Sequence, residues 1–387
     1  MSGVFDTDVA VLAATEVPYR RRVESGVGTG DLLAQAVIDA VERAGFSLDD
    51  VDGLAVSSFT HAPDRAVDLA WSLGLRTRWF MDDGCGGVSG FNTLQHAWRA
   101  LQAGDADLIV LVAGDVFQAD DFSRLVDHYN QTTRNWLRPL EYGGPNGVFA
   151  MLTTRQMQRY GLQRADYGRL AVAQREWAML NPGAVYRTPL SLETYLDAPM
   201  VADPLGLYDC VPVVSGANAL VLARTDRARG RHARIAGFAA RHNPDGQQGD
   251  GLATGLRQVA GELWRQSGIG PGDIQLAAIY DDYPAMVLAQ LDDLGFIADG
   301  DYAGFIQREL ATRRFPVNTS GGQLSAGQAG TAGGMHGIVE VARHLMGEAD
   351  ERQVPQARYG LASGYGMVEY RYGMCAAAVI LEAGGGS

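Results

Sequence analysis

Two glycine-rich loops, one in each half of the chain, carry the residues best suited to chemistry. The first covers residues 83–90 and reads Asp-Gly-Cys-Gly-Gly-Val-Ser-Gly, and the second covers residues 318–328 and reads Asn-Thr-Ser-Gly-Gly-Gln-Leu-Ser-Ala-Gly-Gln. A helical pattern follows the first loop, and the N-terminus of a helix favours negative charge. Glycine lets a ligand approach the backbone closely. Gly86 and Gly87 are therefore candidates to donate N–H groups to a negatively charged oxygen.

Cys85 is the first candidate nucleophile. A thiol near a helix N-terminus has a lowered pKa, and its thiolate is nucleophilic. The alternative is that the Cys85 side chain faces the end of the preceding strand. His96 lies on the following helix, whose apolar residues have core spacing, so we expect His96 to have a packing role. Cys210 and Cys375 are expected to be structural.

A second group of candidates follows the apolar strand expected at residues 276–279. Tyr280 should emerge at the carboxyl end of that strand, where α/β proteins build their sites, and its phenol can donate a hydrogen bond. The alternative is a tyrosine that covers a hydrophobic pocket. Asp281 and Asp282 are adjacent, so at most one of them should face the pocket. We expect Asp281 to be a candidate general base and Asp282 to cap the helix that begins near Pro284.

Composition sets bounds on these hypotheses. The chain has 387 residues, is 47% hydrophobic and carries a net charge of −13, which argues against nucleic-acid binding. No apolar run approaches the about 20 residues of a membrane span, and no secretory signal is evident. Three widely spaced cysteines fit a reducing cytoplasm and indicate neither a disulfide framework nor a metal site. The 32 basic residues are all arginine, so no lysine can form a Schiff base.

The chain contains an internal repeat. Residues 43–56 match residues 266–279, and each copy reads as a helix end, a glycine stop, a short loop and a buried strand. Apolar strands are expected at residues 10–14, 108–113 and 376–381, and strands that are apolar on both faces indicate covered sheets. We therefore expect two similar α/β halves, residues 1–228 and 229–387, with an insert at about 117–204.

Together these segments resemble the thiolase superfamily, in its sterol-carrier-protein-x-like branch. The resemblance covers nearly the whole chain and implies a layered α/β/α/β/α core with the insert as a loop domain over the substrate. It places the family's nucleophilic cysteine at Gly87, not at Cys85, and the family's histidine at Gln328. Asn318 matches the asparagine that opens the second loop. His336, eight positions beyond Gln328, is not expected to replace the missing histidine.

The resemblance also assigns roles near Tyr280 and the C-terminus. The segment from Tyr280 to Tyr283 matches a motif whose first residue helps to hold the enolate oxygen, and relatives that cleave steroid side chains use tyrosines in place of the cysteine and histidine. Ser363 takes the register of the family's second cysteine. Around it, Gly364, Tyr365 and Gly366 form a loop that is able to complete the oxyanion hole.

Three functions follow from this resemblance. The first is a retro-aldol lyase that acts on a β-hydroxyacyl-CoA through a thioester enolate, with Tyr280 or Asp281 handling the proton. The second is a thiolase- or Claisen-type acyltransferase that uses Cys85. The third is a non-catalytic subunit that binds acyl-CoA or has a structural role, and that would tolerate bulky residues at Gly87 and Gly366.

The resemblance further implies a coenzyme A thioester as substrate, without a permanently bound cofactor, and a homodimeric core. It also implies a small partner protein with an OB-fold and a zinc ribbon. The arginines at 20–22 and 313–314 are candidates to meet CoA phosphates.

Overall fold

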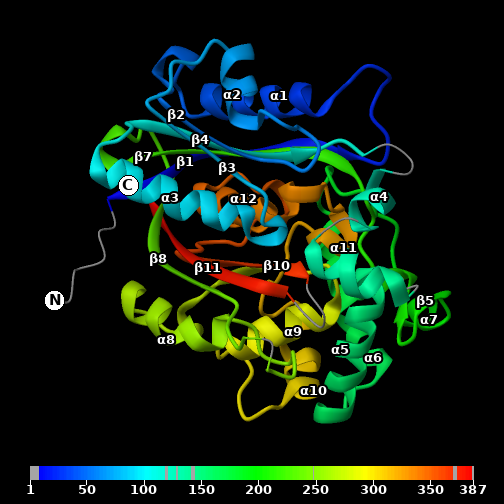
Figure 1. The fold of residues 1–387 in the computed structure, drawn as a ribbon. Coiled ribbons are helices and arrows are strands. Elements are labelled where there is room, and N and C mark those ends of the chain that lie inside the picture. The colour runs from blue at the N-terminus through cyan, green and yellow to red at the C-terminus, as the bar shows by residue number, and fades with distance from the viewer. Residues whose placement is uncertain are drawn as a thin grey trace.

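Helices and sheets alternate in five layers from the top to the bottom of the view in Figure 1. The computed structural model describes residues 8–117, 121–127, 130–140, 144–246, 248–368 and 373–385. The elements of the first half are β1 (Val9–Arg20), α1 (Thr29–Arg43), β2 (Gly53–Ser57), α2 (Arg65–Ser72), β3 (Trp79–Asp83), α3 (Ser89–Ala103), β4 (Leu108–Asp115) and β7 (Ser215–Arg224).

The insert and the second half supply the remaining helices and strands. Between β4 and β7 lie α4 (Asp121–Asp127), α5 (Pro145–Tyr160), α6 (Arg164–Ala178), α7 (Leu192–Leu196), β5 (Met200–Ala202) and β6 (Leu205–Gly206). The second half consists of β8 (His232–His242), α8 (Leu256–Ser267), β9 (Leu276–Ile279), α9 (Pro284–Asp293), α10 (Tyr302–Phe305), α11 (Gly322–Ala326), α12 (Gly333–Met346), β10 (Tyr359–Val368) and β11 (Gly373–Gly384).

The strands of both halves form one hydrogen-bonded ladder in the order β3-β2-β4-β7-β1-β8-β11-β10-β9. The strands β1 and β8 pair only briefly, through Ala10 with Arg234 and Val11 with Ala233. The ladder divides at this junction into two sheet layers, with α3 and α12 between them, α1 and α2 outside one sheet, and α8 and α9 outside the other (Figure 1). The predicted layered α/β/α/β/α fold is confirmed.

The repeated segments adopt the same local structure in both halves. In the first, α1 is followed by Gly45 with a φ of +78°, a 3₁₀ turn at Leu48–Asp50 and β2. In the second, α8 is followed by Gly268 with a φ of +71°, a 3₁₀ turn at Pro271–Asp273 and β9. A left-handed backbone at the helix end favours glycine, which explains why both copies carry it there.

The strands at 10–14, 108–113 and 376–381 lie within β1, β4 and β11, and every residue of β4 is buried. The boundary expected after residue 228 falls between β7 and β8, and the division into two halves stays a prediction. Among the described residues, no helix combines the length and apolarity that a bilayer span requires.

Candidate active site

A pocket lies at the carboxyl end of β9, between the two glycine-rich loops. Its narrow lobe has a cavity volume of about 70 Å³ and is lined by Gly86 and Gly87 of the first loop and Gln328 of the second. A wider lobe of about 450 Å³ extends toward the insert and the segment before β7. The residues common to both lobes are Phe122, Val126, Pro145, Asp282 and Gln328. The fold therefore brings both loops to one cavity, with α4 and α5 of the insert forming part of its wall.

Three side chains form a hydrogen-bonded triad in this pocket. The Tyr280 hydroxyl donates to Asp282 Oδ2 at 3.0 Å. The Gln328 amide Nε2 donates to Asp282 Oδ1 at 2.6 Å and lies 3.2 Å from the Tyr280 hydroxyl oxygen. All three residues line the narrow lobe. A phenol, a carboxylate and an amide at these distances can exchange and hold a proton without a thiol or an imidazole.

Asp282 has the electrostatic setting of an acid–base group. Burial raises the pKa of its carboxyl to about 7, and the nearby Asp281 carboxylate acts in the same direction. Hydrogen bonds from Tyr280 and Gln328 oppose this rise in pKa. The Asp282 carboxyl therefore changes charge near neutral pH, whereas an ordinary aspartate would be fully ionised there.

The structure reverses the expected arrangement of the two aspartates. Asp281 faces the interior, where its carboxylate accepts hydrogen bonds from the backbone N–H groups of Gln323 and Leu324 at the start of α11 and from the side chain of Gln174. The residue that precedes α9 directly is Tyr283, and Asp282 makes no side-chain cap there. Asp281 thus anchors the second loop, and Asp282, expected to be a helix cap, is the carboxylate in the pocket.

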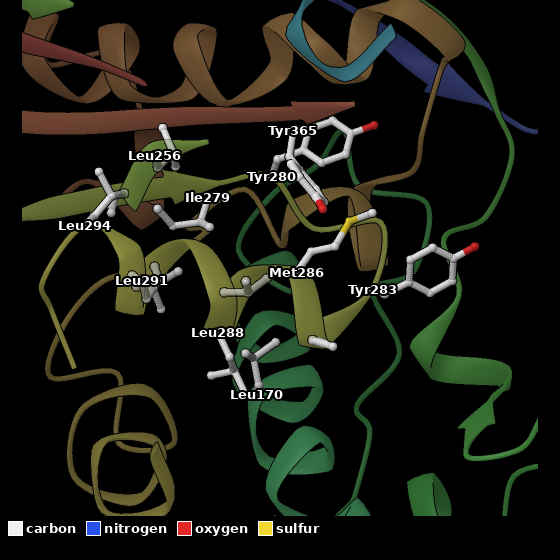
Figure 2. Packing of buried hydrophobic residues seen from close by; sticks show 14 of the residues in the cluster. Leu170, Leu256, Ile279, Tyr280, Tyr283, Met286, Leu288, Leu291, Leu294 and Tyr365 are labelled. Atoms are coloured by element: carbon white, nitrogen blue, oxygen red, sulfur yellow. The ribbon is translucent and has the colours of Figure 1, made fainter. Parts of the chain in front are cut away.

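Gly87 is needed because of its neighbours. A Cβ atom at this position would lie 2.5 Å from Tyr280 Cζ and 2.2 Å from the backbone oxygen of Tyr365. The Tyr280 ring therefore fills the space into which a side chain at position 87 would point. Figure 2 shows Tyr280 and Tyr365 side by side above α9, with Tyr283 and Met286 following along the chain.

Residues 364–366, expected to form a loop, lie within strand β10 and pack on the first glycine loop by backbone contact. A Cβ at Gly364 would lie 2.6 Å from the Gly87 oxygen, and one at Gly366 would lie 2.7 Å from the Gly87 nitrogen. The Tyr365 ring is buried, and its hydroxyl accepts a hydrogen bond from the backbone N–H of Gly373. Substitutions at Gly87 and Gly366 thus disturb packing whether or not the protein is a catalyst, so tolerance at these positions cannot separate the two cases.

Ser363 stabilises the end of β9 through Gln290. Its hydroxyl donates to Gln290 Oε1 at 2.8 Å, and the Gln290 amide Nε2 donates to the backbone oxygen of Tyr280 at 2.8 Å. Asn318 acts in a similar way, since its Oδ1 accepts a hydrogen bond from the N–H of Ile279 at 2.7 Å. Both side chains fix the end of β9 rather than line the pocket. Gln290, in the middle of the apolar helix α9, gave no signal in the sequence.

Cys85 lies at the start of the 3₁₀ turn Gly86–Val88 and lines neither lobe. Burial raises the pKa of its thiol, and the charge and hydrogen bond of Asp83 raise it further. The lowered pKa expected from the helix N-terminus is therefore wrong, because burial, and after it the Asp83 carboxylate, disfavours the thiolate.

A buried aspartate that the sequence analysis missed ties the two halves together beside the pocket. Asp115, at the end of β4, accepts hydrogen bonds from the N–H groups of Phe59, Thr60 and Thr331 at 2.8 Å each. Phe59 and Gly330 both line the narrow lobe. The only sequence signal was an acidic residue at the end of an otherwise apolar strand.

The remaining candidates lie away from the pocket. His96 is exposed on α3, so the packing role expected for it is wrong. His336 is buried, 2.7 Å from Ser320 Oγ and 3.1 Å from Glu16 Oε2. Arg313 pairs with Glu176, and Arg314 pairs with Glu309 beside a separate surface hollow. Neither arginine lines either lobe of the pocket.

Comparison with known proteins agrees with this geometry. Residues 237–382 match the thiolase C-terminal domain-like family. The steroid side-chain-cleaving aldolase of Thermomonospora curvata is 33% identical over 361 residues, which cover 88% of this chain and 90% of the aldolase. This chain belongs to the thiolase superfamily, in its branch related to sterol carrier protein 2. The similarity that shows this membership covers most of the chain and is not limited to the C-terminal match.

Two further members of this branch are similar. The 17-hydroxy-3-oxo-4-pregnene-20-carboxyl-CoA lyase of Mycobacterium tuberculosis is 34% identical over 339 residues, covering 82% of this chain and 86% of the lyase. Among solved structures, the Ltp2-ChsH2(DUF35) aldolase superimposes with a TM-score of 0.83 at 29% identity, covering 98% of this chain and 99% of that one.

Proposed function

We propose that the protein is a lyase that cleaves a β-hydroxyacyl-CoA by a retro-aldol reaction. The observation that carries this proposal is the triad of Tyr280, Asp282 and Gln328 in the narrow lobe, with the Tyr280 ring against Gly87. The lobe thus offers proton-handling groups where the resemblance places the thiolase nucleophile. The relatives named aldolase and CoA lyase support the same reaction class.

The reaction needs two functions from the pocket. A base removes the β-hydroxyl proton, the oxygen forms a carbonyl, and the electron pair of the Cα–Cβ bond moves into the thioester to form an enolate. Donors must then stabilise the enolate oxygen until Cα takes up a proton. We assign the oxyanion role to the backbone N–H groups of Gly86 and Gly87, which line the narrow lobe, together with the Tyr280 phenol. Gly364 and Gly366 line neither lobe and pack against Gly87 from β10, so we assign them a packing role. The products are a ketone or aldehyde and a shorter acyl-CoA.

Acyl transfer through Cys85 has less support. The thiol lines neither lobe, and its raised pKa keeps it protonated at neutral pH. No histidine is among the described residues that line the pocket. A purely structural role leaves the perturbed carboxyl of Asp282 without a use.

A cleavage assay tests the proposal. The protein is incubated with β-hydroxyacyl-CoA thioesters whose β-carbon is tertiary, and the carbonyl product and the acyl-CoA are measured by mass spectrometry. We expect both products in equal amounts, and a 10²–10³-fold loss of rate in Tyr280→Phe, since removing one oxyanion donor has an effect of about this size. The control Tyr359→Phe removes a hydroxyl that binds Glu382 away from the pocket and should cleave at the normal rate.

The same samples test the alternative. Intact mass after incubation with acetyl-CoA or propionyl-CoA should show no adduct on the wild type. A thioester adduct that disappears in Cys85→Ala, together with no cleavage, would establish acyl transfer and refute the lyase assignment.

We further propose the assembly and setting that the resemblance implies. The substrate is a coenzyme A thioester, with no resident cofactor, and the protein acts in the cytoplasm as a homodimer with a DUF35-type partner that carries an OB-fold and a zinc ribbon. A DUF35 protein is named in the similar aldolase structure, which supports the partner. The open edge of β3, which pairs only with β2 among the described strands, supports the dimer.

A further inference from the structure

Asp282 occupies the junction of the pocket. It is one of the residues that line both the narrow lobe, where the glycine loops lie, and the wide lobe, which opens toward the insert. Asp282 is the only titratable residue among the five described residues that line both lobes, so a substrate that occupies both lobes lies beside its carboxyl group. In the proposed reaction, the bond to be broken joins the thioester side of the substrate to the side that leaves as the carbonyl product. A group at the junction is well placed to contact the β-hydroxyl between them.

The hydrogen bonds around Asp282 determine what Tyr280 can do. A phenol has one proton, and that of Tyr280 is donated to Asp282 Oδ2. The amide of Gln328 donates to the other carboxylate oxygen at 2.6 Å and faces the phenol oxygen at 3.2 Å. While Asp282 is ionised, the Tyr280 proton is directed to Asp282 and not to the substrate. Tyr280 becomes available to an enolate oxygen once Asp282 gains a proton of its own.

The surroundings of Asp282 favour such an exchange. Burial and the Asp281 carboxylate raise its pKa to about 7, so both protonation states are accessible near neutral pH. The titratable residues that line the two lobes are Tyr280, Tyr283 and Cys210, in addition to Asp282 itself. No arginine or histidine is among the described lining residues, so no cation in the wall holds the carboxylate in its charged form.

We propose that the Asp282 carboxylate accepts the β-hydroxyl proton and that this transfer releases the Tyr280 phenol to the enolate oxygen. The inference rests on the proposed retro-aldol function. The proton moves from the substrate oxygen to Asp282, the oxygen lone pair forms the carbonyl, and the Cα–Cβ electron pair becomes the enolate. The protonated Asp282 then supplies a proton to Cα, which restores the carboxylate. Gln328 is a positioning residue that keeps the carboxylate directed at Tyr280.

The test is the pH dependence of cleavage by Asp282→Asn, an isosteric change without a titratable group. For the wild type, kcat/KM should fall as the pH drops through about 7, because the base must be ionised. We expect Asp282→Asn to lose 10²–10⁴-fold in rate, the range of general acid–base catalysis, and to lack this acidic limb. Gln328→Ala should keep the fall in kcat/KM at low pH but move its midpoint to higher pH, because the substitution removes a hydrogen bond that stabilises the carboxylate.

A second variant covers the case in which Asp282→Asn does not fold. Asp282→Ala leaves space for a small carboxylate, and added formate should restore at least part of its cleavage rate. Asp282→Asn that cleaves within threefold of the wild type with an unchanged acidic limb would overturn the inference, as would Asp282→Ala that is folded but not rescued by formate. If the wild type itself cleaves no β-hydroxyacyl-CoA, the proposed function fails first, so the two failures are distinguishable.

Discussion

At the scale of single residues, the site depends on a close contact between a glycine and a tyrosine. The Tyr280 ring packs against the backbone at Gly87, and the backbone oxygen of Tyr365 closes the same space from the other side. Even a single methyl group added at Gly87 would shift its neighbours, because the site is closely packed and neither neighbour can move without disturbing β9 or β10. Gly87 therefore sets the position of the phenol.

Gly87→Ala should test this contact. The added Cβ would overlap Tyr280 and the Tyr365 oxygen, so we expect a loss of about 1–3 kcal/mol in the free energy of unfolding and a large loss of cleavage. Denaturant unfolding and the cleavage assay measure the two effects. Gly84→Ala is the matched control, since its Cβ would meet no atom within 4 Å. Equal stability of the two variants would show that the loop adapts.

The choice between Asp281 and Asp282 could not be predicted from the sequence. Adjacent residues on a strand face opposite ways, which predicted that only one of Asp281 and Asp282 would enter the pocket. Because β9 ends at Ile279, however, strand alternation cannot say which one. That choice depends on the N–H groups of Gln323 and Leu324, which lie about 40 positions away in sequence and bind Asp281. The raised pKa of Cys85 likewise depends on its burial and on the position of Asp83, neither of which the loop sequence determines.

At the scale of elements, the sequence was more informative. A glycine after each of α1 and α8, followed by a short loop and a buried strand, predicted the repeated unit because helix ends and buried strands leave local signals. What it did not predict is how α12 is fixed to the loop before it. There, Glu340 on α12 receives hydrogen bonds from Thr319 Oγ1 and from Arg352 Nε, each at 2.8 Å.

The buried ion pair of Glu340 and Arg352 should dominate the stability of the second loop. Glu340 and Arg352 are almost fully buried, so neutralising the acid in Glu340→Gln leaves an uncompensated guanidinium. We expect the free energy of unfolding at pH 7 to fall by about 3–5 kcal/mol. Glu348→Gln, which removes the partner of Arg43 at the surface, is the control and should change it by about 1 kcal/mol or less.

The contribution of Glu340 to the free energy of unfolding should depend on pH. Burial opposes ionisation of Glu340, but His344 and Arg352 outweigh it and hold its pKa well below the ordinary range. The stabilisation is therefore complete above the pKa of an unfolded glutamate, about 4.3, and disappears as the pH falls toward the folded value. Urea unfolding at pH 7 and at pH 4 should show the gap between wild type and Glu340→Gln narrowing in acid. A gap that does not depend on pH would mean that the charge is not responsible.

At the scale of the whole molecule, the ladder of strands ends at β3 on one side. Among the described strands, β3 pairs with β2 alone, so one row of its backbone groups is left for another partner. Large apolar side chains are exposed on β3 and on the neighbouring helix α2, with Phe80 55%, Val67 55% and Trp71 83% exposed. An open edge beside such a surface is typical of an interface between subunits.

We expect a second copy of the chain to cover this surface, and Phe80→Arg to separate the proposed dimer. The substitution places a charge at an apolar contact, where desolvation of the guanidinium opposes association. Sedimentation equilibrium should give about twice the chain mass for the wild type and the mass of one chain for Phe80→Arg. Leu140→Arg, at a site 74% exposed in the insert, is the control and should leave the dimer intact.

A monomeric wild type would refute the dimer, and a Phe80→Arg variant that stays dimeric would place the interface elsewhere. The described lining of the pocket comes from the two glycine loops, the insert, Phe59, the segment 280–283 after β9 and the segment before β7, and none of it comes from β3 or α2. Loss of the dimer should therefore lower cleavage only if subunit contact holds the first loop in position, and the activity of the monomeric variant measures that dependence directly.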